Sequence, residues 1–308
     1  MGSLSRPLVH TKGLTVRYGR RPPAVEKVDL DILAGELVAL LGPNGSGKTT
    51  LLRALAGDLR AASGSIERAA LASGYAGDEA VHADALGTRA NALAFARANG
   101  TAQAERAVDH LLGAFGLAAW TARPAGELSF GNRRKLQLIE AFAHTPRLLF
   151  LDEPTLGLDP DASSALTSLL RRTAADGGAV LMATNDVAFA QEIATRVVFM
   201  RQGRLVTEGT PDALMRAVRQ TTRIEVDVAG TPPPVAFRNG VHATAGADGY
   251  VLQTDGGSAA LPEICAALTD AGAHITSIRI VRADLTDAFR TMTGETWQPE
   301  ATSRERVR

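Results

Sequence analysis

Apolar and polar residues alternate over much of the first forty positions, and short continuous apolar runs follow. The alternating segments LTVRY (14–18) and VEKVDLDI (25–32) predict strands with one buried face. The continuous runs ELVALL (36–41), RLLFLDEP (147–154) and AVLMAT (179–184) are typical of strands buried on both faces. Helical spacing separates these runs. We therefore expect an α/β fold with a mainly parallel sheet and a β-strand-rich N-terminal subdomain.

Helical spacing is clearest in four stretches. The segment 49–57 predicts a helix that ends at Gly57, and the alanine-rich stretch from about 85 to 145 is too long for one crossover. It predicts a separate helical subdomain. DASSALTSLLRRTAA predicts an amphipathic helix capped near Asp161 or Ser163. VAFAQEIA predicts a short helix, and RVVFMRQGRLVTEG a hairpin that turns at Gln202-Gly203.

The composition shifts after about residue 220. TRIEVDVAG and HITSIRIV predict strands, TPPPV predicts a loop because proline cannot continue a helix, and two helices are expected to end at Gly272 and Gly294. The chain is thus expected to hold a large domain over 1–220, a small α+β domain over 221–295 and a frayed tail over 296–308.

The segment GPNGSGKT (42–49) lies between a predicted strand and a predicted helix, which is the context of a P-loop. Backbone N–H groups of such a loop close around phosphate at a helix N-terminus. We expect Lys48 to reach the β and γ phosphates and Thr49 to bind Mg²⁺. The expected nucleotide-binding residues are Gly42, Pro43, Asn44, Gly45, Ser46, Gly47, Lys48, Thr49 and Thr50.

An acidic pair ends the apolar run LLFLDE. Asp152 is expected beside the P-loop, where its carboxylate can hold Mg²⁺ through water. Successive side chains of a strand face opposite ways, so Glu153 can point to an attacking water. Glu153 is the candidate general base.

The composition of the chain limits the classes of partner that it can have. The formal net charge is zero, which argues against a general nucleic-acid-binding protein. The single cysteine excludes a disulfide within the chain, and no apolar run has the length of a membrane span. If the protein acts at a membrane, a partner must hold it there.

The order of P-loop, helical insert, LSFGNRRK, LLFLDEP and GLDP over about residues 5–220 resembles the ATP-binding cassette (ABC) transporter ATPases. The resemblance implies ATP and Mg²⁺ as ligands and a head-to-tail dimer, in which the signature motif of one chain covers the γ-phosphate held by the other. It assigns that role in trans to Ser129, Gly131 and Asn132. It also implies that Tyr18 stacks on adenine and that Asp159 of GLDP communicates across the dimer.

The signature departs from the family's LSGGQ, because Phe130 replaces a glycine and Asn132 the glutamine. Arg133, Arg134 and Lys135 follow it in the first turn of a helix, where cations oppose the helix dipole. One interpretation is that a polyphosphate arriving from the partner chain relieves this conflict. The other is an ordinary solvated basic turn.

Two more departures concern the site itself. Asp78, or Glu79 after a one-residue slip, stands at the place of the family's Q-loop glutamine and could face Mg²⁺. Asn185 replaces the switch histidine and cannot carry a positive charge. Losing a charged donor at a transition state costs on the order of 10² to 10³ in rate. We therefore expect a weak but active ATPase, with Glu153, Lys48 and Asn185 as its catalytic residues.

Functions of different classes follow from these patterns. GTPDALMR (209–216) and LTDAFRTMTG (285–294) resemble the ends of drug- and antibiotic-efflux ATPase subunits, which favours an exporter motor docked on a separate permease at the cytoplasmic face of the membrane. An alternative is a weakly hydrolysing nucleotide-gated clamp paired with a complete ATPase chain. A third class, ABC ATPases of DNA repair or translation, would show long coiled coils or two cassettes, and this chain shows neither.

Overall fold

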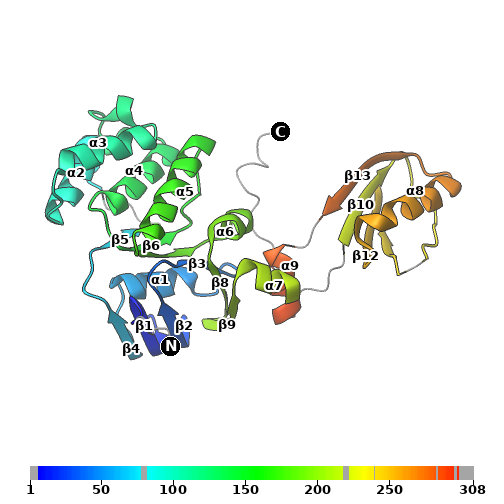
Figure 1. Cartoon of the computed structure of the whole chain (residues 1–308), viewed down its shortest axis with the longest axis horizontal. Helices are drawn as coiled ribbons and strands as arrows, with labels where there is room; N and C mark the ends of the chain where they lie inside the picture. Colours follow the sequence, from blue (N-terminus) through cyan, green and yellow to red (C-terminus); the bar gives the residue numbers. More distant parts are fainter. Residues whose placement is uncertain are drawn as a thin grey trace. The chain divides into compact units, whose positions relative to one another are not determined.

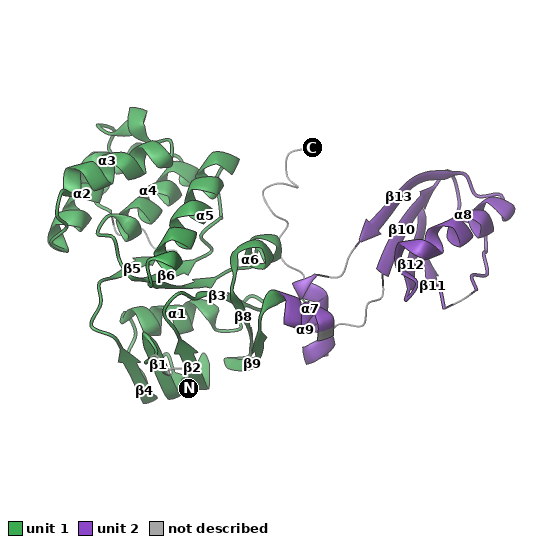
Figure 2. Cartoon of the chain, viewed as in Figure 1, with its two compact units in different colours: residues 1–211, 297–308 green, residues 212–296 purple. Residues whose placement is uncertain are grey.

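The computed structural model describes residues 6–77, 82–217, 222–238, 240–281, 284–294 and 297. The chain divides into two compact units (Figure 2). Unit 1 comprises residues 1–211 and 297–308, and unit 2 comprises residues 212–296. Of the tail predicted over 296–308, only Trp297 is among the described residues.

Unit 1 is built on a six-stranded sheet of order β5-β6-β7-β3-β8-β9 (Figure 1). Its strands are β5 (Ser73–Ala76), β6 (Leu148–Asp152), β7 (Ala179–Ala183), β3 (Leu37–Leu41), β8 (Arg196–Arg201) and β9 (Arg204–Gly209). Neighbours are parallel from β5 to β8, and only β8 and β9 pair antiparallel. Every residue of β3, β6 and β7 is buried, as their continuous apolar runs predict. The expected mainly parallel sheet is confirmed.

A second, antiparallel sheet of order β2-β1-β4 is formed by β2 (Val25–Ile32), β1 (Val9–Val16) and β4 (Ser63–Arg68). Helix α1 (Lys48–Ala56) contacts β1 of this sheet and β6 and β7 of the larger one. Its Leu51, Leu52 and Leu55 are fully buried and join the core that both sheets share. The helix ends where predicted, at Gly57, whose φ of 103° suits glycine.

Three helices pack against one another and form the expected helical subdomain (Figure 1): α2 (Thr88–Ala98), α3 (Ala104–Ala114) and α4 (Phe130–Phe142). Two 3₁₀ turns, η1 (Ala118–Trp120) and η2 (Ala125–Glu127), lead from α3 to α4. Ser129 caps α4, because its hydroxyl accepts a hydrogen bond of 3.3 Å from the Asn132 N–H.

The predicted cap of the helix after GLDP is wrong. Helix α5 (Pro160–Ala175) begins at Pro160, a residue suited to the first helical position, so the capping residue is the one before it. The Asp159 carboxylate accepts a hydrogen bond of 2.8 Å from the Ala162 N–H. Helix α6 (Val187–Ile193) follows β7 as expected.

Unit 2 contains an antiparallel sheet of order β11-β12-β10-β13. Its strands are β11 (His242–Ala245), β12 (Gly249–Thr254), β10 (Thr222–Val228) and β13 (Ile275–Val281). Its helices are α7 (Pro211–Ala217), which starts at the boundary residue, η3 (Gly257–Ala260), α8 (Leu261–Asp270) and α9 (Leu285–Thr293). Ile224, Tyr250 and Leu252 of the sheet share a core with Ile264 and Leu268 of α8.

Among the described residues, no helix has both the length and the apolar character needed to cross a membrane.

Candidate nucleotide site

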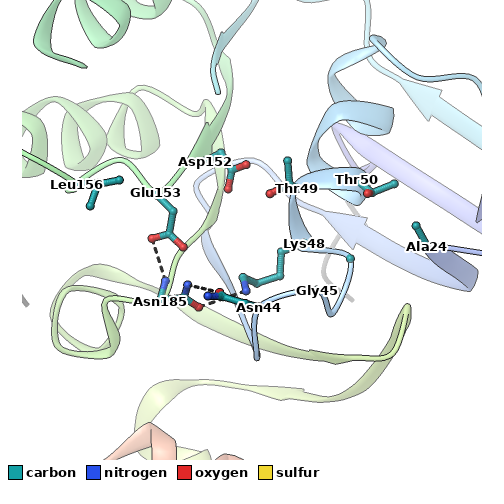
Figure 3. A pocket seen from close by; sticks show the side chains of 11 residues that line it. Ala24, Asn44, Gly45, Lys48, Thr49, Thr50, Asp152, Glu153, Leu156 and Asn185 are labelled. Carbon is teal, nitrogen blue, oxygen red and sulfur yellow. Dashed lines mark hydrogen bonds between the residues drawn. The ribbon is translucent and has the colours of Figure 1, made fainter. Parts of the chain in front are cut away.

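The carboxyl ends of β3, β6 and β7 meet at one edge of the six-stranded sheet, and a cavity of about 380 Å³ lies there (Figure 3). Each strand delivers a chemically active segment to this edge. The P-loop follows β3, Glu153 follows β6, and Thr184 and Asn185 follow β7. The residues that line the cavity are Ala24, Asn44, Gly45, Gly47, Lys48, Thr49, Thr50, Asp152, Glu153, Leu156 and Asn185.

Two P-loop glycines are required by close backbone approaches. A Cβ at Gly42 would lie 2.1 Å from the Met200 carbonyl oxygen, and one at Gly47 would lie 2.2 Å from that of Ala24. Both residues also have positive φ, at 154° and 104°. The loop therefore turns tightly into α1, and the N-terminal residues of this helix line the cavity, where a helix N-terminus favours phosphate.

Lys48 is the first residue of α1 and is only 6% exposed. Its ammonium donates hydrogen bonds to the carbonyl oxygens of Gly42 (2.6 Å) and Pro43 (3.2 Å) and to Asn185 Oδ1 (3.2 Å). The cation is thus held by oxygen atoms at the wall of the cavity. A phosphate oxygen is a stronger, charged acceptor for the same ammonium.

Asp152 and Glu153 both line the cavity, but the expected strand alternation is wrong for Glu153, which follows the end of β6 with a φ of 43°. Asp152 ends β6, is 2% exposed and lines the cavity with Thr49. A carboxylate and a hydroxyl are hard oxygen donors, so this pair fits Mg²⁺. Glu153 lines the cavity, and its Oε2 accepts hydrogen bonds from the Thr184 hydroxyl (3.1 Å) and the Asn185 N–H (3.0 Å), which fix the orientation of the carboxylate (Figure 3).

The surroundings of Glu153 act on the pKa of its carboxyl in both directions. Burial raises the pKa of its carboxyl above the ordinary glutamate value. The hydrogen bonds from Asn185 and Thr184 and the charge of Lys48 act in the opposite direction, and Asp152 raises the pKa further. A raised pKa brings a carboxylate closer to the range in which it accepts protons effectively.

Asn185 connects three parts of the site. Its amide N–H₂ donates a 2.8 Å hydrogen bond to Asn44 Oδ1, its Oδ1 accepts from Lys48, and its backbone N–H donates to Glu153. It is 8% exposed. The residue at the predicted switch position thus lies between the P-loop and the candidate base.

The remaining predicted residues lie elsewhere. Tyr18 is 45% exposed and its hydroxyl is 3.4 Å from Thr50 Oγ1, at the start of α1. The signature residues Ser129, Gly131 and Asn132 lie at the start of α4 and, in the described part of the chain, do not line the cavity. The candidates Asp78 and Glu79 lie outside the described residues.

The structure corrects both interpretations of the cations after the signature. Acceptors within the same chain already bind these cations, so no partner's phosphate is needed to neutralise them and the turn is not solvated. Arg133 donates to the carbonyl oxygens of Leu128 (3.1 Å) and Gly126 (2.5 Å). Arg134 and Lys135 are 5% and 7% exposed, and Lys135 forms an ion pair with Asp159.

The sequence did not predict two features of the site. Ala24 and Leu156 line the cavity, and Leu156 is a large apolar side chain that is 47% exposed. The sequence feature that could have indicated Leu156 is its position two residues after LDEP. The start of α4 also approaches the GLDP segment closely, since a Cβ at Gly131 would lie 2.7 Å from the Gly157 carbonyl oxygen.

The chain is similar to known proteins in sequence and in fold. A family model described as "ABC transporter" matches residues 25–156. The "Daunorubicin resistance ATP-binding protein DrrA3" of Streptomyces coeruleorubidus is 32% identical and covers 92% of this chain and 95% of its own length. The "Zinc import ATP-binding protein ZnuC" of Paracoccus denitrificans is 35% identical, over 73% of this chain and 88% of its own. A solved structure titled "Structure of ATP binding subunit of ABC transporter" has a TM-score of 0.64 at 28% identity and covers 68% of this chain and 92% of its own.

Proposed function

This chain belongs to the ATP-binding proteins of the ABC transporter family, which hydrolyse ATP to drive transport, and we propose that it powers the export of a drug, antibiotic or other small molecule through a separate membrane permease. It would act at the cytoplasmic face of the membrane, held there by the permease. No nucleic acid is needed for this role.

The observation that favours export is the extent of the similarity. Two daunorubicin-resistance proteins match 92% and 93% of this chain. The unmatched remainder is smaller than unit 2, so the match extends into that unit. The zinc and hemin import proteins match 73% and 65% of the chain. The proteins named for drug resistance therefore share more of the chain, including part of unit 2.

The site residues have complementary tasks in ATP hydrolysis. Lys48 and the P-loop N–H groups bind the β and γ phosphates. Thr49 and Asp152 would hold Mg²⁺, which supplies charge neutralisation at the phosphates when bound. Asp78 is a further candidate for this metal. Glu153 takes a proton from the attacking water, as a general base whose pKa is raised by burial.

A second ATPase chain, identical or different, completes the site in this proposal. Its Ser129, Gly131 and Asn132 would cover the γ-phosphate, and Asp159 would communicate across the dimer. Tyr18 would stack on adenine. The neutral Asn185 amide can donate a hydrogen bond to the γ-phosphate but supplies no charge, so turnover is expected to be slow.

Steady-state ATP hydrolysis by the purified chain tests the catalytic part. Glu153→Gln should lower kcat by about 10²- to 10⁴-fold while ATP remains bound, because the base is lost and the charge of Lys48 is kept. Asn185→His should raise kcat. Bound ATP with no turnover in any variant would contradict the proposal and favour the clamp.

Membrane vesicles that contain the chain and its co-purifying permease test the direction. We expect ATP-dependent accumulation of a fluorescent amphipathic drug inside inside-out vesicles and none with Glu153→Gln. Transport in the opposite direction, measured in right-side-out vesicles loaded with ATP, would refute export while leaving the ATPase assignment intact.

A further inference from the structure

Arg134 is a buried cation that the roles proposed above do not use. Burying a charge is costly unless its donors are paired. Its Nη1 donates to the Gly77 carbonyl oxygen (2.7 Å) and to Gln137 Oε1 (2.9 Å). Its Nη2 donates to the Glu153 carbonyl oxygen (3.0 Å) and also to that of Asp152. One guanidinium on α4 thus binds the segments that follow β5 and β6.

The two carbonyls bound by Nη2 belong to the peptide planes on either side of the Glu153 Cα. Glu153 has a φ of 43°, in the left-handed region that non-glycine residues seldom adopt. Such a conformation persists only when its surroundings determine it. Arg134 contacts both flanking planes, and so bears directly on the φ and ψ of the candidate base.

We propose that Arg134 is a positioning residue for ATP hydrolysis, which fixes the backbone of Glu153 so that the carboxylate stays directed at the nucleotide cavity. This inference rests on the proposed role of Glu153 as general base. The Thr184 hydroxyl and the Asn185 N–H orient the carboxylate at its far end, and Arg134 holds the peptide from which it projects.

The chemistry of the side chain explains why arginine is needed. A guanidinium is planar and presents five donors in a fixed fork, so it can serve the carbonyls of Gly77, Asp152 and Glu153 together. A lysine ammonium is a compact point charge on a flexible stem. Arg134→Lys therefore keeps the charge and loses the simultaneous hold on both peptide planes.

The test compares Arg134→Lys and Arg134→Met with Arg133→Met. Arg133 is the neighbouring residue of α4 and also binds two carbonyls, those of Leu128 and Gly126, away from Glu153. Misplacing a reacting group by about 1 Å can cost on the order of 10²-fold in rate. We expect both Arg134 variants to lose about 10- to 100-fold in kcat, with KM and the ATP dissociation constant within about threefold. Arg133→Met should keep kcat within about twofold.

A double-mutant cycle with Glu153→Gln isolates the route of the effect. If Arg134 acts through Glu153, Arg134→Met should cost less than about twofold in kcat once the base is already lost. Additive losses would overturn the inference, and so would wild-type kcat in Arg134→Lys. A parallel loss of ATP binding and kcat in both Arg134 variants would assign the residue to general folding and overturn it as well. Wild-type turnover in Glu153→Gln alone would instead refute the general-base role, and the inference with it.

Discussion

The buried pair of Glu140 and His82 makes the stability of the helical subdomain depend on pH. Glu140 lies in α4 at 1% exposure, and its Oε2 is 3.8 Å from His82 Nδ1. Within the described residues, neither side chain makes a hydrogen bond. Burial raises the pKa of Glu140 to about 8 and lowers the pKa of His82, while Asp84 raises and Arg133 lowers the latter. Both groups of the pair are therefore neutral at pH 7.

The sign of the dependence follows from the raised pKa. An unfolded Glu140 ionises near pH 4.5, whereas the folded one keeps its proton to about pH 8. Its contribution to stability is thus complete below pH 4.5 and is lost as the pH rises through about 8. Each pH unit in this window costs about 1.4 kcal/mol of unfolding free energy.

The comparison with Glu140→Gln isolates Glu140, because His82 is present in both chains. At pH 6.5 an unfolded histidine with the ordinary pKa of 6.5 is half protonated, so the wild type alone would report both groups. Allowing for half ionisation of Glu140 at pH 8, the contribution of Glu140 should fall by roughly 1.7 kcal/mol from pH 6.5 to pH 8. Glu140→Gln keeps the size of the side chain and removes its ionisation. The free energy of unfolding of the variant should therefore gain about 1.7 kcal/mol on that of the wild type.

Urea unfolding followed by fluorescence measures this difference. In a Trp297→Phe background, Trp120 of η1 is the reporter in the helical subdomain, since the chain has two tryptophans. Glu127→Gln is the matched control, because the Glu127 side chain is 63% exposed and any general effect of replacing glutamate by glutamine would appear there as well. A constant difference for Glu140→Gln, or a wild type that gains on it as the pH rises, would refute the reasoning.

Three further predictions concern the site. Lys48→Met should raise the ATP dissociation constant about 10- to 100-fold in equilibrium binding, because a charged hydrogen bond contributes about 1.5–3 kcal/mol; unchanged affinity would contradict it. Tyr18→Ala should raise the KM for ATP about tenfold if Tyr18 stacks on adenine, whereas Tyr18→Phe keeps the ring and should stay within about twofold. Gly131→Ala places a Cβ 2.7 Å from the Gly157 carbonyl oxygen and should lower stability by about 1–3 kcal/mol in thermal unfolding. The control Gly113→Ala meets open space in α3 and should raise stability by about 0.5–1 kcal/mol, so equal effects would refute the steric argument.

Local signals predicted the catalytic edge of the sheet. Continuous apolar runs specify β3, β6 and β7, and each run is followed directly by the residues that line the cavity. Because the carboxyl ends of neighbouring parallel strands lie together, the positions of Lys48, Asp152 and Asn185 in the sequence were enough to bring them to one site.

Other elements have weaker patterns in the sequence. β4 is mostly exposed and its residues, SGSIER, show no regular alternation, so no strand was predicted there. β12 does alternate, with Tyr250, Leu252 and Thr254 buried, and that signal was missed. The cap of α5 was misplaced because Asp159, Asp161 and Ser163 are all competent capping residues, and only the position of Pro160 distinguishes them.

The local sequence could not predict which groups bind the basic residues that follow the signature. Arg134 binds carbonyls 57, 18 and 19 residues away, and Lys135 pairs with a residue 24 positions away. Helical spacing fixes which face of α4 carries a side chain, but the acceptors come from the end of β6, the residues that follow β5 and β6, and the cap of α5. Charged residues near a helix N-terminus oppose its dipole only when nothing else neutralises them, and here tertiary contacts do.

These contacts connect α4 to other parts of unit 1. Its first turn carries the signature, Lys135 reaches the Asp159 cap of α5, and Arg134 reaches the peptide of Glu153. A displacement of α4 relative to the sheet must lengthen buried, charge-assisted hydrogen bonds, each worth more than a neutral one. The position of the candidate base and the position of the signature are therefore tied to the same helix.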